Sequence, residues 1–179
     1  MIPNTKRHPT LETERLRLDP LAPADVAQLI PLMDDREVMA YWDAPAVEDP
    51  DRIAAIVENQ VAAMAAGIAS HWTVRSLADD VFLGCCSLPE IDRGHKRGEV
   101  GFVLGRGAWG AGHALEAMRL VVAYAASSGL RKLAARTHLG HRRSDALLEE
   151  LGFKQQGLLR GHVLRDGERR DCRLFGLML

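Results

Sequence analysis

Apolar and polar residues alternate along several short stretches of the chain, and most of these stretches end near glycine, proline or aspartate. This period-two pattern predicts β-strands with one buried face. Two connections have the composition of tight hairpin turns, Ala78-Asp79-Asp80 and Asp166-Gly167. We expect strands over residues 13–18, 71–76, 81–91, 96–104, 130–138, 153–164 and 172–179.

Other stretches repeat apolar residues every three or four positions, which predicts amphipathic helices. In one of them Ile53, Val57 and Met64 share a helical face, and Gly67 ends the pattern. The helices expected from such spacing and from breakers cover 25–33, 35–41, 51–66, 110–127 and 142–151. The order β-α-α-α-β-β-β-α-β-α-β-β predicts one mixed α/β domain over 1–179, with 1–10 as a flexible or extended N-terminal segment.

Composition narrows the possible partners. The chain has 179 residues, of which 47% are hydrophobic and 26% charged, and its net charge is -1. A net charge so close to zero gives no reason to expect nucleic-acid or acidic-membrane binding. Cys85, Cys86 and Cys172 form no disulfide or zinc spacing, no segment is apolar enough to span a bilayer, and the first ten residues lack the apolar core of a signal peptide. We therefore expect a cytoplasmic protein without a metal.

The segment 99–117 predicts a strand, a turn crowded with glycine and then a helix. The first N–H groups of a helix have no partners within it, and the helix dipole favours negative charge beside them. Glycine lets a phosphate approach the backbone closely. This segment therefore predicts a site for a phosphorylated ligand.

Two ligand classes compete for that turn. Residues 105–110 satisfy the pattern G-x-G-x-x-G of dinucleotide-binding proteins. That reading needs an acidic residue at the end of the next strand, but the expected strand 130–138 carries Arg131, Lys132 and Arg136 and no acid. Only one further helix and two strands would follow. The dinucleotide interpretation is therefore disfavoured.

The second match is shifted by a few residues. Trp109-Gly110-Ala111-Gly112-His113-Ala114, followed by Glu116-Ala117, resembles the pyrophosphate-binding turn of the GNAT superfamily of N-acetyltransferases. The chain is most similar to the branch of bacterial enzymes that acetylate ribosomal-protein N-termini. Four other segments resemble that branch in the same order: 11–18, 35–42, 98–104 and 144–153.

The resemblance implies a fold, an activity and a cofactor. The fold is a mostly antiparallel central sheet, flanked by helices, that splays open between its fourth and fifth strands, here 99–104 and 130–138. The activity is acetyl transfer from acetyl-CoA to a primary amine by direct attack in a ternary complex, and a homodimer is plausible. The pantetheine arm would bind the main chain of Phe102, Val103 and Leu104, where a backbone N–H could polarise the thioester. The pyrophosphate would bind the turn from Trp109 to Ala114.

Proton transfer is the chemical demand of this reaction. An α-amine with a pKa of about 8 costs roughly 1.4 kcal/mol to deprotonate at pH 7, and a lysine roughly 4.6 kcal/mol. Glu99 stands where many family members carry a glutamate that takes this proton. A solvated carboxylate paired with Lys96 or Arg97 is an equally good interpretation. Glu116 fits a structural role at the start of a helix better.

The acid that protonates the thiolate is harder to identify, because no tyrosine lies on the last helix. The family branch has an Asn-x-x-Ser signature, which here reads His141-Arg142-Arg143-Ser144. Ser144 could hydrogen-bond the sulfur or cap the helix. His141 could contact pantetheine, transfer a proton or lie at the surface.

The acceptor pocket should lie across the splay, near the early helices. Tyr41, Trp42 and Trp72 are the candidate lining residues, although each could equally belong to the core. A peptide N-terminus, an antibiotic, a polyamine and an amino acid all remain possible acceptors. A non-catalytic protein that senses acyl-CoA is the third alternative.

Overall fold

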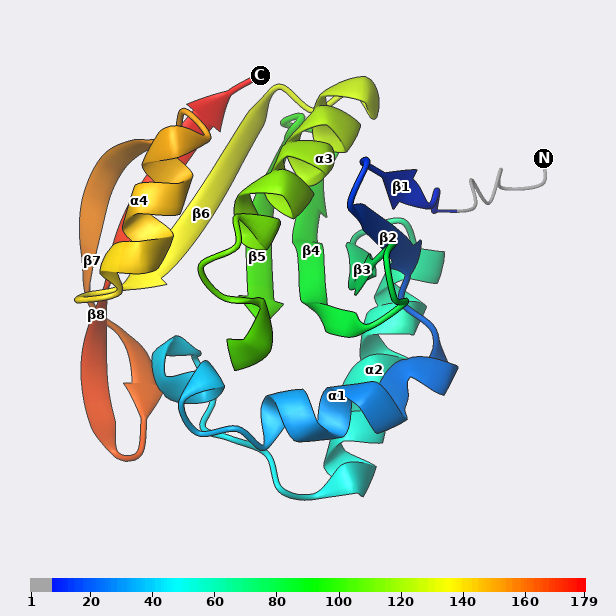
Figure 1. The fold of residues 1–179 in the computed structure, drawn as a ribbon. Coiled ribbons are helices and arrows are strands. Elements are labelled where there is room, and N and C mark those ends of the chain that lie inside the picture. The colour runs from blue at the N-terminus through cyan, green and yellow to red at the C-terminus, as the bar shows by residue number, and fades with distance from the viewer. Residues whose placement is uncertain (1–7) are drawn as a thin grey trace.

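The computed structural model describes residues 8–179, which form one eight-stranded sheet with helices on both faces (Figure 1). The strand order is β1-β2-β3-β4-β5-β6-β8-β7. All neighbouring strands are antiparallel except β5 and β6, which are parallel. This confirms the single-domain, mostly antiparallel α/β architecture expected from the sequence.

The strands are β1 (Leu11–Glu12), β2 (Leu16–Pro20), β3 (Ser70–Ser76), β4 (Phe82–Asp92), β5 (Arg97–Leu104), β6 (Lys132–His138), β7 (Lys154–Arg165) and β8 (Glu168–Met178). The α-helices are α1 (Val26–Met33), α2 (Pro50–Ala65), α3 (His113–Ser127) and α4 (Arg142–Glu150). Three 3-10 helices connect them: η1 (Pro23–Asp25), η2 (Val38–Tyr41) and η3 (Arg106–Ala108).

Alternation along the strands creates two cores, one on each face of the sheet. Helices α3 and α4 cover one face, where a single cluster joins Met118 of α3 and Leu148 of α4 to Trp72 and Val100 of the strands. Helices α1 and α2 cover the other face around Val57. Even-numbered residues of β5 face the core under α3 and α4, whereas Glu99 and Val103 face the side of the sheet covered by α1 and α2.

The parallel pair β5–β6 holds together for only three residue pairs, from Arg97 opposite Lys132 to Glu99 opposite Ala134. Beyond Glu99 the two strands diverge toward their C-terminal ends (Figure 1). This confirms the splay expected between the fourth and fifth strands, which are numbered β5 and β6 because the two-residue β1 precedes them. The divergence leaves facing backbone groups without ladder partners, so a ligand can use them.

Several expected element ends shift by a few residues. The strand expected over 13–18 begins only at Leu16, because Thr13 and the turn after β1 interrupt the pairing. The helix expected from residue 110 begins at His113, because Gly110 and Gly112 have φ angles of 78° and 78° and cannot join it. Both predicted hairpin turns are present, with left-handed Asp80, Asp166 and Gly167.

Part of the segment expected to be flexible or extended is attached to the domain. The side chain of His8 lies 3.0 Å from the Met64 carbonyl and 3.1 Å from Ser70 Oγ, and Trp72 Nε1 donates to the Pro9 carbonyl. The remainder of that expectation, residues 1–7, lies outside the described residues. Within 8–179, no helix is both long and apolar enough to cross a bilayer.

Candidate active site

The glycine turn between β5 and α3 presents a row of backbone N–H groups. Gly110 and Gly112 adopt left-handed conformations on either side of Ala111. The first backbone bond into α3 runs from the Glu116 N–H to the Gly112 carbonyl at 3.1 Å. Among residues 8–179, no acceptor pairs with the N–H groups of 110–115. The turn therefore has free donors at the positive end of a helix, as an anion site requires.

Side chains from the other end of the sequence fix this turn in place. Arg15 donates to the Ala111 carbonyl at 3.2 Å and to Glu116 Oε2 from Nε at 2.8 Å. The Thr13 hydroxyl donates to the other oxygen of Glu116. Burial opposes the charged form of Glu116, but these hydrogen bonds outweigh it and hold the pKa of Glu116 below its usual value. Glu116 is thus a structural residue, as the sequence favoured.

A chain of charged groups lies where β5 and β6 separate. Glu99 does not pair with Lys96 or Arg97; its Oε1 accepts a hydrogen bond from Arg136 Nε at 2.9 Å. Arg136 Nη1 also lies 3.6 Å from Asp43 Oδ2. Asp43 Oδ1 in turn lies 2.9 Å from His138 Nε2. Glu99, Arg136 and His138 occupy the sheet face opposite α3 and α4, next to the loop after η2.

That loop is held by one arginine from the far end of the chain. Nη1 of Arg165, at the end of β7, donates to the carbonyls of Met39, Ala40 and Trp42 at 2.7, 3.0 and 2.8 Å. Only 9% of the Arg165 side chain is exposed. Its bonds terminate η2 in the way that a capping cation does. The β7–β8 hairpin therefore positions Tyr41, Trp42 and Asp43.

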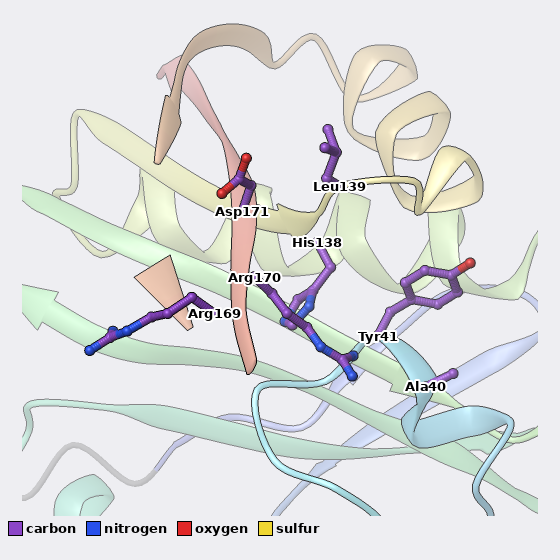
Figure 2. Close-up of a pocket in the computed structure, with 7 residues that line it drawn as sticks. All are labelled: Ala40, Tyr41, His138, Leu139, Arg169, Arg170 and Asp171. Carbon is purple, nitrogen blue, oxygen red and sulfur yellow. The ribbon is translucent and has the colours of Figure 1, made fainter. Parts of the chain in front are cut away.

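A pocket of about 350 Å³ lies between η2, the end of β6 and β8. Figure 2 shows Tyr41 on one side, His138 in the middle, and Arg170 extending toward Tyr41, whereas Arg169 points away. Asp171 Oδ1 is occupied by the N–H of Gly161 at 2.7 Å. The full lining is Ala40, Tyr41, His138, Leu139, Arg169, Arg170 and Asp171. Its charged lining is mixed in sign, with two arginines and one carboxylate.

The start of α4 lies next to this pocket, where Tyr41 contacts His141. His141 is the N-cap, and its Nδ1 accepts the Ser144 N–H at 3.2 Å. Burial lowers the pKa of His141, which favours this neutral acceptor form. The Ser144 hydroxyl lies 3.2 Å from His141 Nε2. Because His141 is the capping residue, Ser144 does not cap the helix. The rings of Tyr41 and His141 are in contact, with centroids 4.2 Å apart.

The other expected cofactor residues line the opposite wall. Phe102, Val103 and Leu104 lie on β5 beyond its last pairing with β6. The Leu104 carbonyl accepts a hydrogen bond from Trp109 Nε1 at 2.8 Å, so the indole braces the turn. The guanidinium of Arg143 lies 5.2 Å from the Trp109 ring centroid and thus links α4 to this wall. Arg106 is directed away, toward Asp35 and Glu37.

One candidate acceptor residue is wrong. Trp72 has no exposed surface: it lies in the core below α3, with its ring 5.1 Å from that of Tyr124. Its position on a central strand buries it, because β3 lies between β2 and β4. Tyr41 does line the pocket, and Trp42 is 38% exposed on the adjoining loop.

The sequence did not single out Asp43, Arg136, His138 or Arg165 for the roles that their contacts indicate. Alternation along β6 places Arg136 and His138 on one face, which was the available signal. Nothing in the sequence places Asp43 against His138 or Arg165 against η2, since these contacts join residues 95 and more than 120 positions apart.

Comparisons with known proteins agree with this geometry. Residues 15–154 match the family described as acetyltransferase (GNAT) domain. An uncharacterized N-acetyltransferase, p20, of Bacillus licheniformis is 29% identical over 170 residues, covering 94% of this chain and 96% of that protein. The chain therefore belongs to the GNAT acetyltransferase family and is an acyltransferase.

Solved structures share the fold at low identity. RimL, a ribosomal L7/L12 α-N-protein acetyltransferase in complex with coenzyme A, superimposes with a TM-score of 0.88 at 15% identity, covering 96% of this chain and 98% of that one. Spermidine N-acetyltransferase from Vibrio cholerae, in complex with CoA and spermine, gives 0.82 at 20% identity, covering 93% and 96%. The doubly wound parallel sheet of a dinucleotide-binding domain is absent from residues 8–179, because only β5 and β6 are parallel.

Proposed function

We propose that this protein transfers the acetyl group of acetyl-CoA to a primary amine, with the α-amine of a peptide as its acceptor. The observation that carries the proposal is the combination of free N–H groups over 110–115 with the splay beyond Glu99. The turn from Trp109 to Ala114 would hold the pyrophosphate. The separated edge at Phe102, Val103 and Leu104 would hold the pantetheine arm. This places the thioester between β5 and β6, with the amine arriving from the η2 side.

The reaction needs a neutral amine and a protonated leaving thiolate. The amine nitrogen forms a bond to the thioester carbon, the carbon–sulfur bond breaks, and a proton lost from nitrogen is regained at sulfur. Glu99 lies at the fork and is one candidate for the group that takes the first proton, directly or through water. Ser144 and His141, at the start of α4, are the candidates for contacts with the pantetheine arm or the sulfur.

The choice of a peptide over a polyamine rests on charge. A polyamine carries several cationic groups and needs several carboxylates to hold them. The pocket instead has Arg170 extending toward Tyr41, and its Asp171 already accepts a backbone N–H. Asp43 is already in contact with Arg136 and His138. A homodimer and a cytoplasmic location remain predictions from the sequence.

Calorimetric titration of the purified protein with acetyl-CoA, with NADH and NADPH as controls, tests the cofactor. We expect binding of acetyl-CoA alone, with a dissociation constant on the order of micromolar. Release of CoA thiol with a peptide bearing an N-terminal serine, compared with spermidine, then tests the acceptor. Binding of a nicotinamide cofactor alone would overturn the proposal. Acetyl-CoA binding without acetylation of any amine would indicate a sensor, and a preference for spermidine would overturn the peptide assignment.

A further inference from the structure

His138 and Asp43 form a pair that the proposed function does not yet use. His138 is the last residue of β6, beyond the point where β5 leaves it, and is 6% exposed. Its Nε2 lies 2.9 Å from Asp43 Oδ1. An ionised carboxylate can only accept, so Nε2 carries the proton and Nδ1 carries the lone pair.

His138 lines the pocket, and its second ring nitrogen, Nδ1, makes no hydrogen bond with residues 8–179. Among those residues, the buried side-chain nitrogens without a partner are His113 Nδ1 and Arg165 Nε, so Nδ1 of His138 is not fully enclosed. Tyr41 and Arg170 line the pocket beside His138 (Figure 2). Nδ1 is therefore an accessible base on the side of the sheet from which the amine would arrive.

We infer that His138, oriented by Asp43, takes the proton from the acceptor ammonium before attack, a role that rests on the proposed acetyl transfer. The ammonium gives one proton to Nδ1, directly or through a water, and the neutral amine then attacks. The imidazolium returns this proton to solvent, while the proton lost from nitrogen during attack ends on the thiol of CoA. Asp43 is the positioning residue: it fixes the tautomer and stabilises the imidazolium that forms.

The contacts of Glu99 favour this assignment over a role as the base. Glu99 Oε1 is occupied by Arg136, whose guanidinium also approaches Asp43. Glu99 is thereby placed to hold Arg136, and Arg136 to hold Asp43. Arg165 completes the arrangement, because it fixes the η2 carbonyls next to Asp43. Substitution of each residue by glutamine distinguishes Glu99 from His138 as the base.

A pH profile near His138 must allow for its charged neighbours. Tyr41 and Asp43 come from η2 and the loop after it, Arg136 from β6, and His141 from the start of α4. Strand β8 contributes Arg169, Arg170, Asp171 and, directly opposite on the ladder, Cys172. Substitution of His138 alone isolates its contribution from theirs.

The test compares His138→Gln and Asp43→Asn with a matched pair elsewhere, His95→Gln and Asp92→Asn. His95 Nδ1 also lies 2.9 Å from a carboxylate, Asp92 Oδ2, but on the β4–β5 hairpin with 79% of its side chain exposed. The readouts are acetyl-CoA affinity by calorimetry and kcat/KM for the serine peptide between pH 6 and pH 10. Thermal melting checks the fold of each variant.

We expect His138→Gln to bind acetyl-CoA normally and to lose about 100-fold in kcat/KM at pH 7. The loss should shrink toward pH 10, where the α-amine is already neutral. Asp43→Asn, at an exposed residue, should lose about 10-fold, and the control pair should match the wild type. An active wild type whose His138→Gln variant keeps its rate, or loses rate equally at every pH, would overturn the assignment alone.

Glu99→Gln separates the two candidate bases. We expect it to keep the pH dependence of the wild type, with a smaller loss in rate than His138→Gln. A loss in rate that shrinks toward pH 10 in Glu99→Gln but not in His138→Gln would assign the base to Glu99 and overturn the role of His138. A wild type that binds acetyl-CoA and acetylates no amine would overturn the proposed function and this inference together. If His138→Gln does not fold, Asp43→Asn at full wild-type activity overturns the inference.

Discussion

The two walls of the splay are built in different ways. The wall proposed to bind the cofactor, here called the cofactor wall, consists of β5, the glycine turn and α3, which follow one another in 97–127. The wall proposed to bind the acceptor, the acceptor wall, brings together η2, the end of β6 and the β7–β8 hairpin, through His138–Asp43 and the Arg165 contacts. The first wall depends on local conformation and the second on distant contacts. Substitutions should therefore damage cofactor binding and acceptor binding separately.

The largest effect should come from the turn itself. Gly110→Val puts a β-branched residue at a φ of 78°, where side chains are strained, although no atom lies within 4 Å of its Cβ position. The turn would have to rearrange and withdraw N–H donors from the pyrophosphate. We expect acetyl-CoA to bind about 10- to 100-fold more weakly by calorimetry, because each charge-assisted hydrogen bond contributes about 1.5–3 kcal/mol.

Gly129→Val is the matched control for the turn. Gly129 also has a left-handed φ, of 92°, and open space around its Cβ position, but it lies beyond the other end of α3. It should lower the melting temperature comparably and leave acetyl-CoA affinity unchanged. Equal affinity of both variants would show that the turn does not bind the cofactor.

An intermediate effect is expected at the acceptor wall. Arg165→Met removes three hydrogen bonds to η2 carbonyls while keeping the apolar part of the side chain. We expect the KM for the acceptor to rise about 10-fold with acetyl-CoA affinity unchanged, because losing charged hydrogen bonds frees Tyr41 and Asp43. Steady-state kinetics with the peptide provides the measurement.

The exposed Arg160→Met, on the same strand, controls for the loss of charge near the hairpin. A change in acetyl-CoA affinity in Arg165→Met as large as the change in KM would show that the two walls are not independent.

The smallest effect should come from the side-chain contacts that hold the glycine turn against Thr13 and Arg15. Glu116→Gln weakens its bonds to Thr13 and Arg15, and should cost about 1 kcal/mol of unfolding free energy at pH 7. Because the pKa of Glu116 is lowered in the folded state, this stabilisation is present above its unfolded pKa of about 4.3 and is lost as the pH falls through the lower folded value. Denaturation of both proteins at pH 7 and pH 3 measures it; a stability gap that does not narrow at pH 3 contradicts it.

The sequence predicted local features well. Alternation located the seven main strands, and glycines and helical spacing located the helices to within a few residues. Adjacent Cys85 and Cys86 point to opposite faces, as the two-residue period of a strand requires, and burial raises the pKa of Cys85 to about 12. The glycine turn was also anticipated from the sequence pattern, whereas the splay was expected only from the family resemblance. The features predicted from the pattern depend on neighbours in the chain or on a strand's two-residue period, which a sequence displays directly.

Side-chain partners across the fold were not predictable in the same way. For Glu99 the sequence left two equal alternatives, a catalytic base or a carboxylate paired with Lys96 or Arg97, and in the structure it pairs with Arg136 on the adjacent strand. Trp72 was a candidate for a pocket and equally for the core, because aromatic residues near a site and in a core look alike in sequence; the structure buries it in the core. The N-cap of α4 is His141 and not Ser144.

The sequence by itself determined where the chain bends, forms strands and forms the glycine turn proposed to bind an anion, since backbone conformation and alternation are local properties. The tertiary structure alone decided which charges meet: His138 with Asp43, Glu99 with Arg136, and Arg165 with the end of η2. Those pairs depend on the parallel placement of β5 beside β6 and on the return of the β7–β8 hairpin to η2. Both arrangements result from burying two cores against one sheet, which no single segment specifies.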